Sequence, residues 1–287
     1  MGLKRDRVAV VTGASRGAGR GIALALGATG ATVYVTGRTQ CEGDAPLPGT
    51  VQATADAVTA AGGRGIAVYC DHADDTQTKA LFERVKQEHA RLDILVNNAT
   101  VLHDALTDVG PFWEKPLELA NVLDVGLRSH YSASWFAAPL LLANGEGLVV
   151  NTSSFGGRIY MHGPAYGAGK AGLDKMTHDM AIDFKPHGIA VVSLWMGLLA
   201  TDRTRRLIAA QPDKYAGMAE AAETPEFSGR IIDALACDPQ LMGKSGKVWI
   251  GAELGQEYGV TDLDGRQPPS PRALFGETTV FGDAVVA

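Results

Sequence analysis

The stretch that decides the fold is Val8-Ala9-Val10-Val11-Thr12-Gly13-Ala14-Ser15-Arg16-Gly17-Ala18-Gly19. A short apolar strand runs into a glycine-rich turn, and the helix that follows is expected to begin near Gly17. Glycine lets the backbone turn tightly and approach a ligand, while the first N–H groups of a helix attract an anion. In this order these features predict a pyrophosphate site, although a tight turn without a ligand is the alternative. The residues expected to line this site are Gly13, Ser15, Arg16, Gly17, Ala18 and Gly19.

The same alternation of apolar runs and helical stretches continues along the chain. The runs are short, uninterrupted and rich in Val and Ile, which is typical of strands buried on both faces of a parallel sheet. They are Val8–Val11, Thr32–Val35, Ile66–Tyr69, Ile94–Val96, Leu148–Val150, Ile189–Leu194 and Val248–Ile250. We therefore expect an α/β fold with a doubly wound parallel sheet in a single domain, residues 1–252. Residues 253–287 contain three prolines among polar residues and are expected to form an extended C-terminal tail.

Composition narrows the classes of function. The 287 residues carry a formal charge of −6, which argues against a nucleic-acid partner. No stretch approaches the roughly 20 apolar residues of a membrane helix, and the first apolar run is too short for a signal peptide. Cys41, Cys70 and Cys237 show no Cys-x-x-Cys spacing, so free thiols in a reducing, cytoplasmic compartment are expected. The histidines have no metal-ligand spacing, and no metal is predicted.

The ends of the second and third strands bear on the choice of nucleotide. NAD sites usually place an acidic residue after the second strand, whereas NADP sites place arginine there to meet the 2′-phosphate. Here the sequence is Gly37-Arg38, which predicts NADP(H), and Arg16 is a second candidate for the same phosphate. Either arginine is alternatively a solvated surface residue. Asp71 follows the third strand and is a candidate for the adenine amino group or, alternatively, a helix cap.

Polar residues also follow the fourth and fifth strands. Asn97 and Asn98 are adjacent carboxamides that either bind a ligand or tie neighbouring strands together. The fifth strand ends in Ser153 and Ser154, a dozen residues before Tyr166. A strand-end hydroxyl that faces a tyrosine on the next helix would let two O–H groups hold one substrate oxygen.

Tyr166 and Lys170 are four residues apart in a helix-compatible stretch and would share one helix face. An ammonium beside a phenol favours the tyrosinate and would lower the tyrosine pKa. The pair is therefore a candidate for acid–base catalysis, and a solvated surface pair is the alternative.

Taken together, these motifs resemble the short-chain dehydrogenases/reductases of the single-domain branch, over about residues 5–250. The resemblance rests on the glycine turn, Asp71, Asn97-Asn98-Ala99, Ser153-Ser154, Tyr166-x-x-x-Lys170 and Met196-Gly197 with Thr201. The stretches Val125–Arg128, Ser193–Trp195 and Tyr258–Arg266 are similar to one mammalian group of that family.

The resemblance implies a Rossmann-like fold and a reversible hydride transfer between NADP(H) and a small carbonyl or alcohol. It implies that Tyr166 is the general acid, that Ser154 polarises the substrate oxygen, and that Lys170 lowers the tyrosine pKa and binds the nicotinamide ribose. Further implied cofactor contacts come from Asn97, Gly197 and Thr201. Assembly into a homodimer or homotetramer is also implied.

Three positions depart from the family pattern. Gly126 stands where an asparagine often supports a proton relay to the lysine, so the relay would run through water or a neighbour such as Asp124. Met196 replaces a proline. Ser154 precedes Tyr166 by 12 residues where 13 is usual, so Ser153 is an alternative to the preferred Ser154.

The substrate itself is not specified by the sequence. The loop over residues 197–226 is expected to fold over a fairly apolar pocket, with Leu198, Leu199, Phe155, Tyr160 and Met161 nearby. The long loop of residues 40–49 has no predicted function. The alternatives are a carbon–carbon double-bond (enoyl-type) reductase of the same fold, a non-catalytic NADP-binding sensor, or an epimerase or dehydratase of the longer branch.

Overall fold

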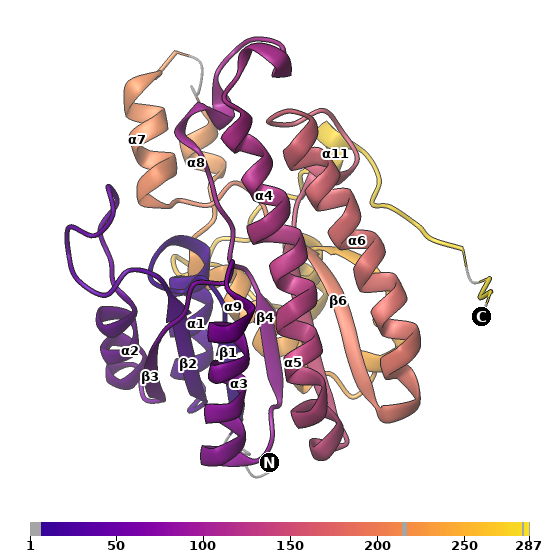
Figure 1. The fold of residues 1–287 in the computed structure, drawn as a ribbon. Helices are drawn as coiled ribbons and strands as arrows, with labels where there is room; N and C mark the ends of the chain where they lie inside the picture. Colours follow the sequence, from indigo (N-terminus) through magenta and orange to yellow (C-terminus); the bar gives the residue numbers. More distant parts are fainter. Residues whose placement is uncertain (1–6, 214–216, 283, 287) are drawn as a thin grey trace.

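A seven-stranded parallel sheet forms the middle layer of the computed structural model (Figure 1), which describes residues 7–213, 217–282 and 284–286. The strand order is β3-β2-β1-β4-β5-β6-β7. The strands are β1 Val8–Val11, β2 Thr32–Gly37, β3 Arg64–Tyr69, β4 Ile94–Asn97, β5 Gly147–Ser153, β6 Ile189–Trp195 and β7 Val248–Ile250. All seven predicted strands are confirmed, and five of them extend beyond the predicted apolar runs because flanking residues outside those runs continue the pairing.

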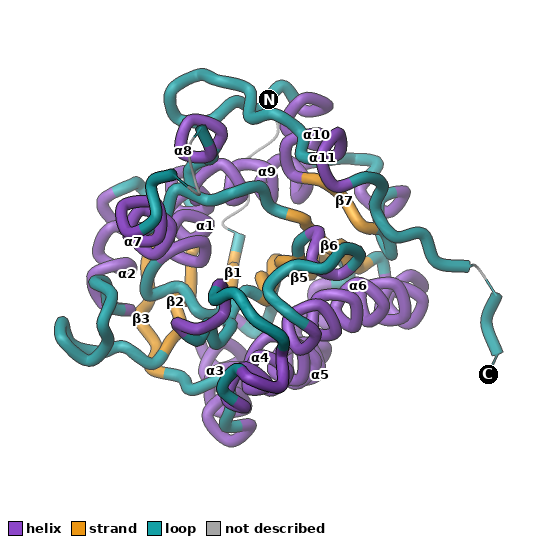
Figure 2. The backbone as a smooth tube through the Cα atoms, turned by 90° about the horizontal axis from the view of Figure 1, so that it is seen from above, coloured by secondary structure: helices purple, strands orange, loops and turns teal. Residues whose placement is uncertain are grey.

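Helices cover both faces of this sheet (Figure 2). The helices are α1 Gly17–Ala28, α2 Val51–Ala60, α3 Asp75–His89, α4 Asn121–Leu123, α5 Ser129–Asn144, α6 Pro164–Phe184, α7 Asp202–Ala210, α8 Met218–Ala221, α9 Pro225–Cys237, α10 Gly251–Tyr258 and α11 Arg272–Phe275. Buried side chains of α1, α2, α9 and α10 pack on one face of the sheet, whereas those of α3, α5 and α6 pack on the other. The predicted doubly wound fold is thereby confirmed.

Local chemistry explains where several helices begin and end. Thr50 caps α2 by accepting a hydrogen bond from the Ala53 N–H at 2.9 Å. Asp74 caps α3 in the same way, accepting from the Thr76 N–H at 2.8 Å, and its carboxylate suits the positive end of the helix dipole. Pro164 occupies the first turn of α6, where its missing N–H costs nothing.

The position of β1 determines where a ligand can bind. Val10 pairs with Tyr34 of β2 on one side and with Leu95 of β4 on the other. The chain therefore winds outward in two directions from β1, and such a switch point leaves a crevice at the carboxyl ends of the strands. The glycine turn after β1 and the polar ends of β4 and β5 all lie at that edge.

The C-terminal part of the chain folds back on the domain. The expected boundary at residue 252 falls inside α10. Beyond it, the carboxylate of Asp262 is buried and accepts a hydrogen bond from the Thr224 N–H at 2.8 Å. Further on, Phe275 of α11 packs against Phe155 with ring centroids 5.1 Å apart. Residues 214–216 of the expected substrate loop, and residues 283 and 287 of the expected tail, lie outside the described residues.

Among the helices of the described residues, none combines the length and apolar character that crossing a membrane would require.

Candidate active site

Tyr166 and Lys170 lie one turn apart near the start of α6, as their spacing predicts. The Lys170 Nζ atom is 5.8 Å from the centre of the Tyr166 ring. Both side chains face the end of β5, since Lys170 Nζ donates to the Thr152 carbonyl at 2.9 Å. Helix geometry and one strand-end carbonyl thus orient the two groups together.

Ser154 is the serine that meets Tyr166. It follows β5 directly, and its Oγ atom lies 2.9 Å from the Tyr166 hydroxyl and accepts from the Gly156 N–H at 3.2 Å. Ser153 points elsewhere, because its hydroxyl donates to the Lys170 carbonyl at 3.5 Å. Of the two candidate serines, the geometry therefore favours Ser154.

Burial controls the protonation of this group. It raises the pKa of Tyr166, and the hydrogen bond from Ser154 opposes this only in part. It also lowers the pKa of Lys170 to about 8, against the attraction of the nearby Asp174 carboxylate. The sequence-based expectation that Lys170 would lower the tyrosine pKa is not met here, because desolvation of the phenol outweighs other effects. Tyr166 consequently keeps its proton at neutral pH.

The glycine turn has the shape expected of an anion cradle. Gly13 adopts φ +66°, and a Cβ atom there would lie only 2.7 Å from the Ala99 Cα atom. Asn98 braces the turn by donating from Nδ2 to the Thr12 carbonyl at 2.8 Å. Arg16, the N-cap residue of α1, makes no side-chain cap. The first N–H groups of α1 therefore keep their capacity to bind an anion. The other residues expected at this site lie on the same segment, Ser15 in the turn and Gly17, Ala18 and Gly19 in the first turn of α1.

The two candidate phosphate-binding arginines differ in their surroundings. Arg16 is held by the loop of residues 40–49, donating to the Pro48 carbonyl at 3.0 Å and to the Gly49 carbonyl at 2.7 Å. Arg38 is largely exposed, and its guanidinium lies 3.9 Å from the Asp71 carboxylate. Asp71 also accepts from the Ala73 N–H at 3.0 Å. The Arg38 guanidinium is therefore less constrained by the protein than the Arg16 guanidinium. The loop of residues 40–49, which had no predicted function, binds Arg16.

Asn97 makes the strand-tying contacts that were one of its two predicted alternatives. Its side chain is fully buried, and Nδ2 donates to Ser134 Oγ and Asn151 Oδ1, both at 2.9 Å. The side chain therefore bridges β4, β5 and α5 behind the crevice. Its Oδ1 atom and the Nδ1 atom of buried His130 have no hydrogen-bond partner among the described residues.

The loop after β6 brings Gly197 and Thr201 to the same edge. Thr201 is the N-cap of α7, accepting from the Thr204 N–H at 3.2 Å. Its methyl group lies opposite Gly17, 3.8 Å from where a Cβ atom of that glycine would be. The Gly197 N–H donates to the buried carboxylate of Glu223 at 3.1 Å.

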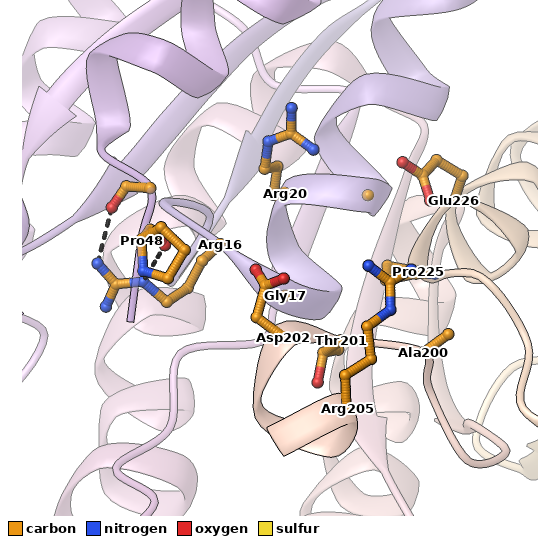
Figure 3. A pocket seen from close by; sticks show the side chains of 12 residues that line it. Arg16, Gly17, Arg20, Pro48, Ala200, Thr201, Asp202, Arg205, Pro225 and Glu226 are labelled. Atoms are coloured by element: carbon orange, nitrogen blue, oxygen red, sulfur yellow. Dashed lines mark hydrogen bonds between the residues drawn. The ribbon is translucent and has the colours of Figure 1, made fainter. Parts of the chain in front are cut away.

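A cavity of about 310 Å³ opens between α1 and α7 (Figure 3). Its walls include the expected site residues Arg16, Gly17 and Thr201. They also include Arg20 and Arg205, which the sequence reasoning missed. Arg20 lies one turn after Arg16, so helical spacing could have indicated it, whereas Arg205 reaches the cavity only because α7 folds over the turn.

A second cavity, of about 230 Å³, is separated from Tyr166 by the side chain of His162. The His162 ring, which lines it, packs edge-on against the Tyr166 ring with centroids 5.1 Å apart. Its walls are formed by Leu106, Thr107, Asp108, Val109, Gly110, Lys115, Tyr160, His162 and Gly163. Of the expected apolar residues only Tyr160 belongs to it, because Phe155 and Met161 pack with Trp195 and Phe275 instead. The walls thus mix apolar and charged side chains.

Comparisons with known proteins agree with this geometry. A sequence profile of the family described as short chain dehydrogenase matches residues 7–212. The chain is similar to "Dehydrogenase/reductase SDR family member 1" of Mus musculus, with 42% identity over 273 residues, covering 91% of this chain and 85% of that protein. The Homo sapiens protein of the same name is 39% identical over 274 residues, covering 91% and 84%.

More distant proteins extend the comparison. A 3-oxoacyl-[acyl-carrier-protein] reductase of Synechocystis is 32% identical over 234 residues, covering 81% of this chain and 90% of that protein. Among solved structures, a putative dehydrogenase from Xanthomonas campestris superposes with a TM-score of 0.78 at 27% identity, covering 94% of this chain and 96% of that one.

Proposed function

The chain belongs to the short-chain dehydrogenase family of oxidoreductases, and on that premise we propose that it is an NADP(H)-dependent carbonyl reductase, acting reversibly on a small carbonyl or secondary alcohol. The observation that carries the proposal is the 2.9 Å contact between the hydroxyls of Ser154 and Tyr166, beside the ammonium of Lys170. Two O–H groups so placed can hold one substrate oxygen, and one of them can pass it a proton.

The residues at the crevice fit a dinucleotide. The tight turn at Gly13 and the uncapped start of α1 suit a pyrophosphate. The cavity between α1 and α7 adds three arginines, which outnumber its two acidic residues, Asp202 and Glu226. Arg38 provides an exposed guanidinium for a 2′-phosphate, with no acidic residue at position 37. When bound, the nicotinamide supplies the hydride. Gly197, Thr201 and the backbone around Asn97 are the further contacts that we propose for it.

The protein's own part is alignment and proton transfer. Burial keeps Tyr166 protonated, which suits a general acid that donates to the oxygen of a carbonyl as it is reduced. Ser154 shares that oxygen and polarises the carbonyl. Lys170, also buried, adds positive charge close to the phenol, which stabilises the tyrosinate left after proton transfer.

The second cavity is the proposed place for the substrate. Its wall residue His162 packs against Tyr166, and it has room for a small molecule, with Leu106 and Val109 for apolar groups and Lys115 for a polar one. The similarity to a 3-oxoacyl-[acyl-carrier-protein] reductase supports a carbonyl rather than a carbon–carbon double bond as the reacting group.

We propose the cytoplasm as the site of action and a homodimer or homotetramer as the working form. The three cysteines are free thiols, which supports a reducing compartment. Tyr131 and Trp135 on the outer face of α5 are 55% and 63% exposed in the single chain, which supports an interface there.

The proposal is tested by fluorescence titration of the protein with NADPH and NADH, followed by a panel of carbonyl compounds monitored at the cofactor absorbance. Tyr166→Phe is the matched variant, because it keeps the ring and removes only the hydroxyl. We expect it to bind NADPH with nearly unchanged affinity and to reduce carbonyls at least ~100-fold more slowly. NADPH binding without turnover of any carbonyl would instead support a non-catalytic sensor, and equal turnover by the variant would refute the role of Tyr166.

A further inference from the structure

Glu223 is a buried acid that holds the loop after β6 by both its backbone and its side chain. Its N–H donates to the Leu198 carbonyl, and its carbonyl accepts from the Ala200 N–H, both at 2.8 Å. Its carboxylate accepts from the Gly197 N–H at 3.1 Å, and the residue is only 3% exposed. Three consecutive contacts therefore fix the segment that lies between β6 and Thr201.

The chain beyond α10 supports Glu223 from the other side. We call residues 260–266 the C-terminal strap. Within it, Asp262 accepts from the Thr224 N–H at 2.8 Å, and Arg266 donates to the Ala222 carbonyl at 2.7 Å. Both neighbours of Glu223 are thus tied to the C-terminal strap, so Glu223 cannot leave the loop without breaking these bonds as well.

The charges around Glu223 are few. Asp262 repels its negative form, whereas Arg266 attracts it, and both belong to the C-terminal strap. The loop on the other side, residues 196–201, contains no charged side chain. Burial dominates and raises the pKa of Glu223 to about 7, although the Gly197 N–H opposes the shift. Near neutral pH the carboxyl group therefore exchanges a proton in its buried position.

We propose that Glu223 is a positioning residue that holds Gly197–Thr201 in its cofactor-facing conformation, and that its buried position becomes less stable when Glu223 loses its proton, because a buried charge next to Asp262 lacks water. The cofactor-facing role of this loop rests on the function proposed above, whereas the contact between Glu223 and Gly197 does not. A glutamate released into water has an ordinary pKa near 4.3. Above that pH the released form is ionised more readily than the buried form, so rising pH favours release.

Hydrogen exchange at the amides of residues 197–201 tests the contact without any cofactor. Glu223→Gln keeps an acceptor oxygen and cannot ionise, so it should hold the loop at every pH. The ratio of wild-type to Glu223→Gln exchange, in which the intrinsic pH dependence cancels, should rise about tenfold between pH 6 and pH 8. Glu220→Gln removes the same charge from an exposed position three residues away and should behave as the wild type.

Glu223→Ala provides a second comparison if the glutamine variant does not fold. It keeps the two backbone bonds of residue 223 but removes the acceptor of the Gly197 N–H, so the Gly197 amide should exchange faster at every pH. Wild-type exchange at that amide should approach that of the alanine variant as pH rises. A ratio to either variant that stays constant from pH 6 to pH 8 would overturn the proposal. So would unchanged exchange in Glu223→Ala.

NADPH titrations of the same proteins separate this inference from the proposed function. We expect the wild-type Kd to rise several-fold more than that of Glu223→Gln between pH 6 and pH 8. Failure of the wild type to bind NADPH at any pH would refute the proposed cofactor and leave the exchange result to judge the Glu223 contact. Equal pH dependence of Kd in both proteins would refute the cofactor-facing role.

Discussion

At the scale of single residues, burial explains the properties of Tyr166. A phenol that loses water is harder to ionise, so its pKa rises even with an ammonium close by. A protonated tyrosine is the form needed to reduce a carbonyl, whereas alcohol oxidation needs the tyrosinate. We therefore expect oxidation to require a higher pH than reduction in this protein, measured as kcat/KM against pH in the two directions. Coincident profiles would contradict this view of Tyr166.

Cofactor choice is also a matter of single residues. A contact between Arg38 and a 2′-phosphate is worth roughly 1.5–3 kcal/mol, so NADPH should outbind NADH by about 10-fold or more. Replacing Gly37 by Asp and Arg38 by Ala together should invert the preference, because the new carboxylate accepts from the free 2′-hydroxyl and repels the phosphate. The aspartate fits after a small shift, since its Cβ atom would lie 3.3 Å from the Val51 methyl group.

The measurement is fluorescence titration with both nucleotides at one fixed ionic strength, because salt screens the phosphate contact. Arg64→Ala, an exposed arginine at the opposite end of β3, serves as the control and should leave the preference unchanged. A wild type that prefers NADH would show that the Arg38 assignment is wrong.

At the scale of elements, the junction between α4 and α5 is unusual. Helical geometry is interrupted at Val125 and at Gly126, which has φ +144°. The interruption is stabilised locally, since the Gly126 N–H donates to Ser129 Oγ at 3.2 Å and the Val125 carbonyl accepts from the Val101 N–H at 3.0 Å. The departure from the family pattern at this position is thus a backbone feature as well as a missing side chain.

Gly126→Ala should therefore destabilise the protein by about 1–3 kcal/mol, because φ +144° strains any side chain. The new Cβ atom would also lie 3.1 Å from Thr100 Oγ1. Gly126→Asn should suffer at least the same loss. Urea unfolding measures the effect, with Gly243→Ala as the control, because that glycine has open space around it and no positive φ. Equal stability of Gly126→Ala and wild type would exclude strain at this junction.

At the scale of the whole molecule, the outer face of α5 is the expected place of assembly. If the interface includes residue 135, Trp135→Glu places a charge inside it. The variant should therefore shift the protein towards monomer, as measured by light scattering at micromolar concentration. Leu274→Glu changes another exposed apolar residue, far along the chain in α11, and should leave the assembly unchanged. A wild type that is already monomeric would refute the predicted assembly.

Acid should destabilise the whole molecule through two buried histidines. Burial lowers the pKa of His72 to about 4 and that of His130 to about 3. Both values lie below the unfolded pKa near 6.5, so their contribution to stability is complete above that pH and is lost as pH falls through the lowered values. Between pH 6 and its lowered pKa, each histidine should reduce the free energy of unfolding by about 1.4 kcal/mol for each pH unit of acidification.

Glu223 acts in the opposite direction, because its raised pKa makes stability increase as pH falls from about 7. Urea unfolding between pH 7 and pH 5 should therefore show a net loss of stability towards pH 5, and the loss should be steeper in Glu223→Gln. His130→Gln should be less sensitive to pH than the wild type. Stability that rises towards pH 5 would contradict the neutral, buried state of the two histidines.

The sequence alone determined the strands and the catalytic candidates, because both depend on local patterns. Continuous Val- and Ile-rich runs are recognisable wherever a strand is buried on both faces. The spacing of Tyr166 and Lys170 places them on one helix face without any tertiary information. Ser154 could be predicted from the sequence because it follows the strand that leads to that helix.

Contacts between distant segments were decided only by the tertiary structure. The carboxylate of Glu223 binds the N–H of Gly197, 26 residues earlier, and Asp262 binds Thr224, 38 residues earlier. The role of Asn97 was open in the sequence until β5 and α5 packed beside it. No local pattern encodes such pairs, because they form only when packing brings the segments together, and the same burial then sets the pKa of each group.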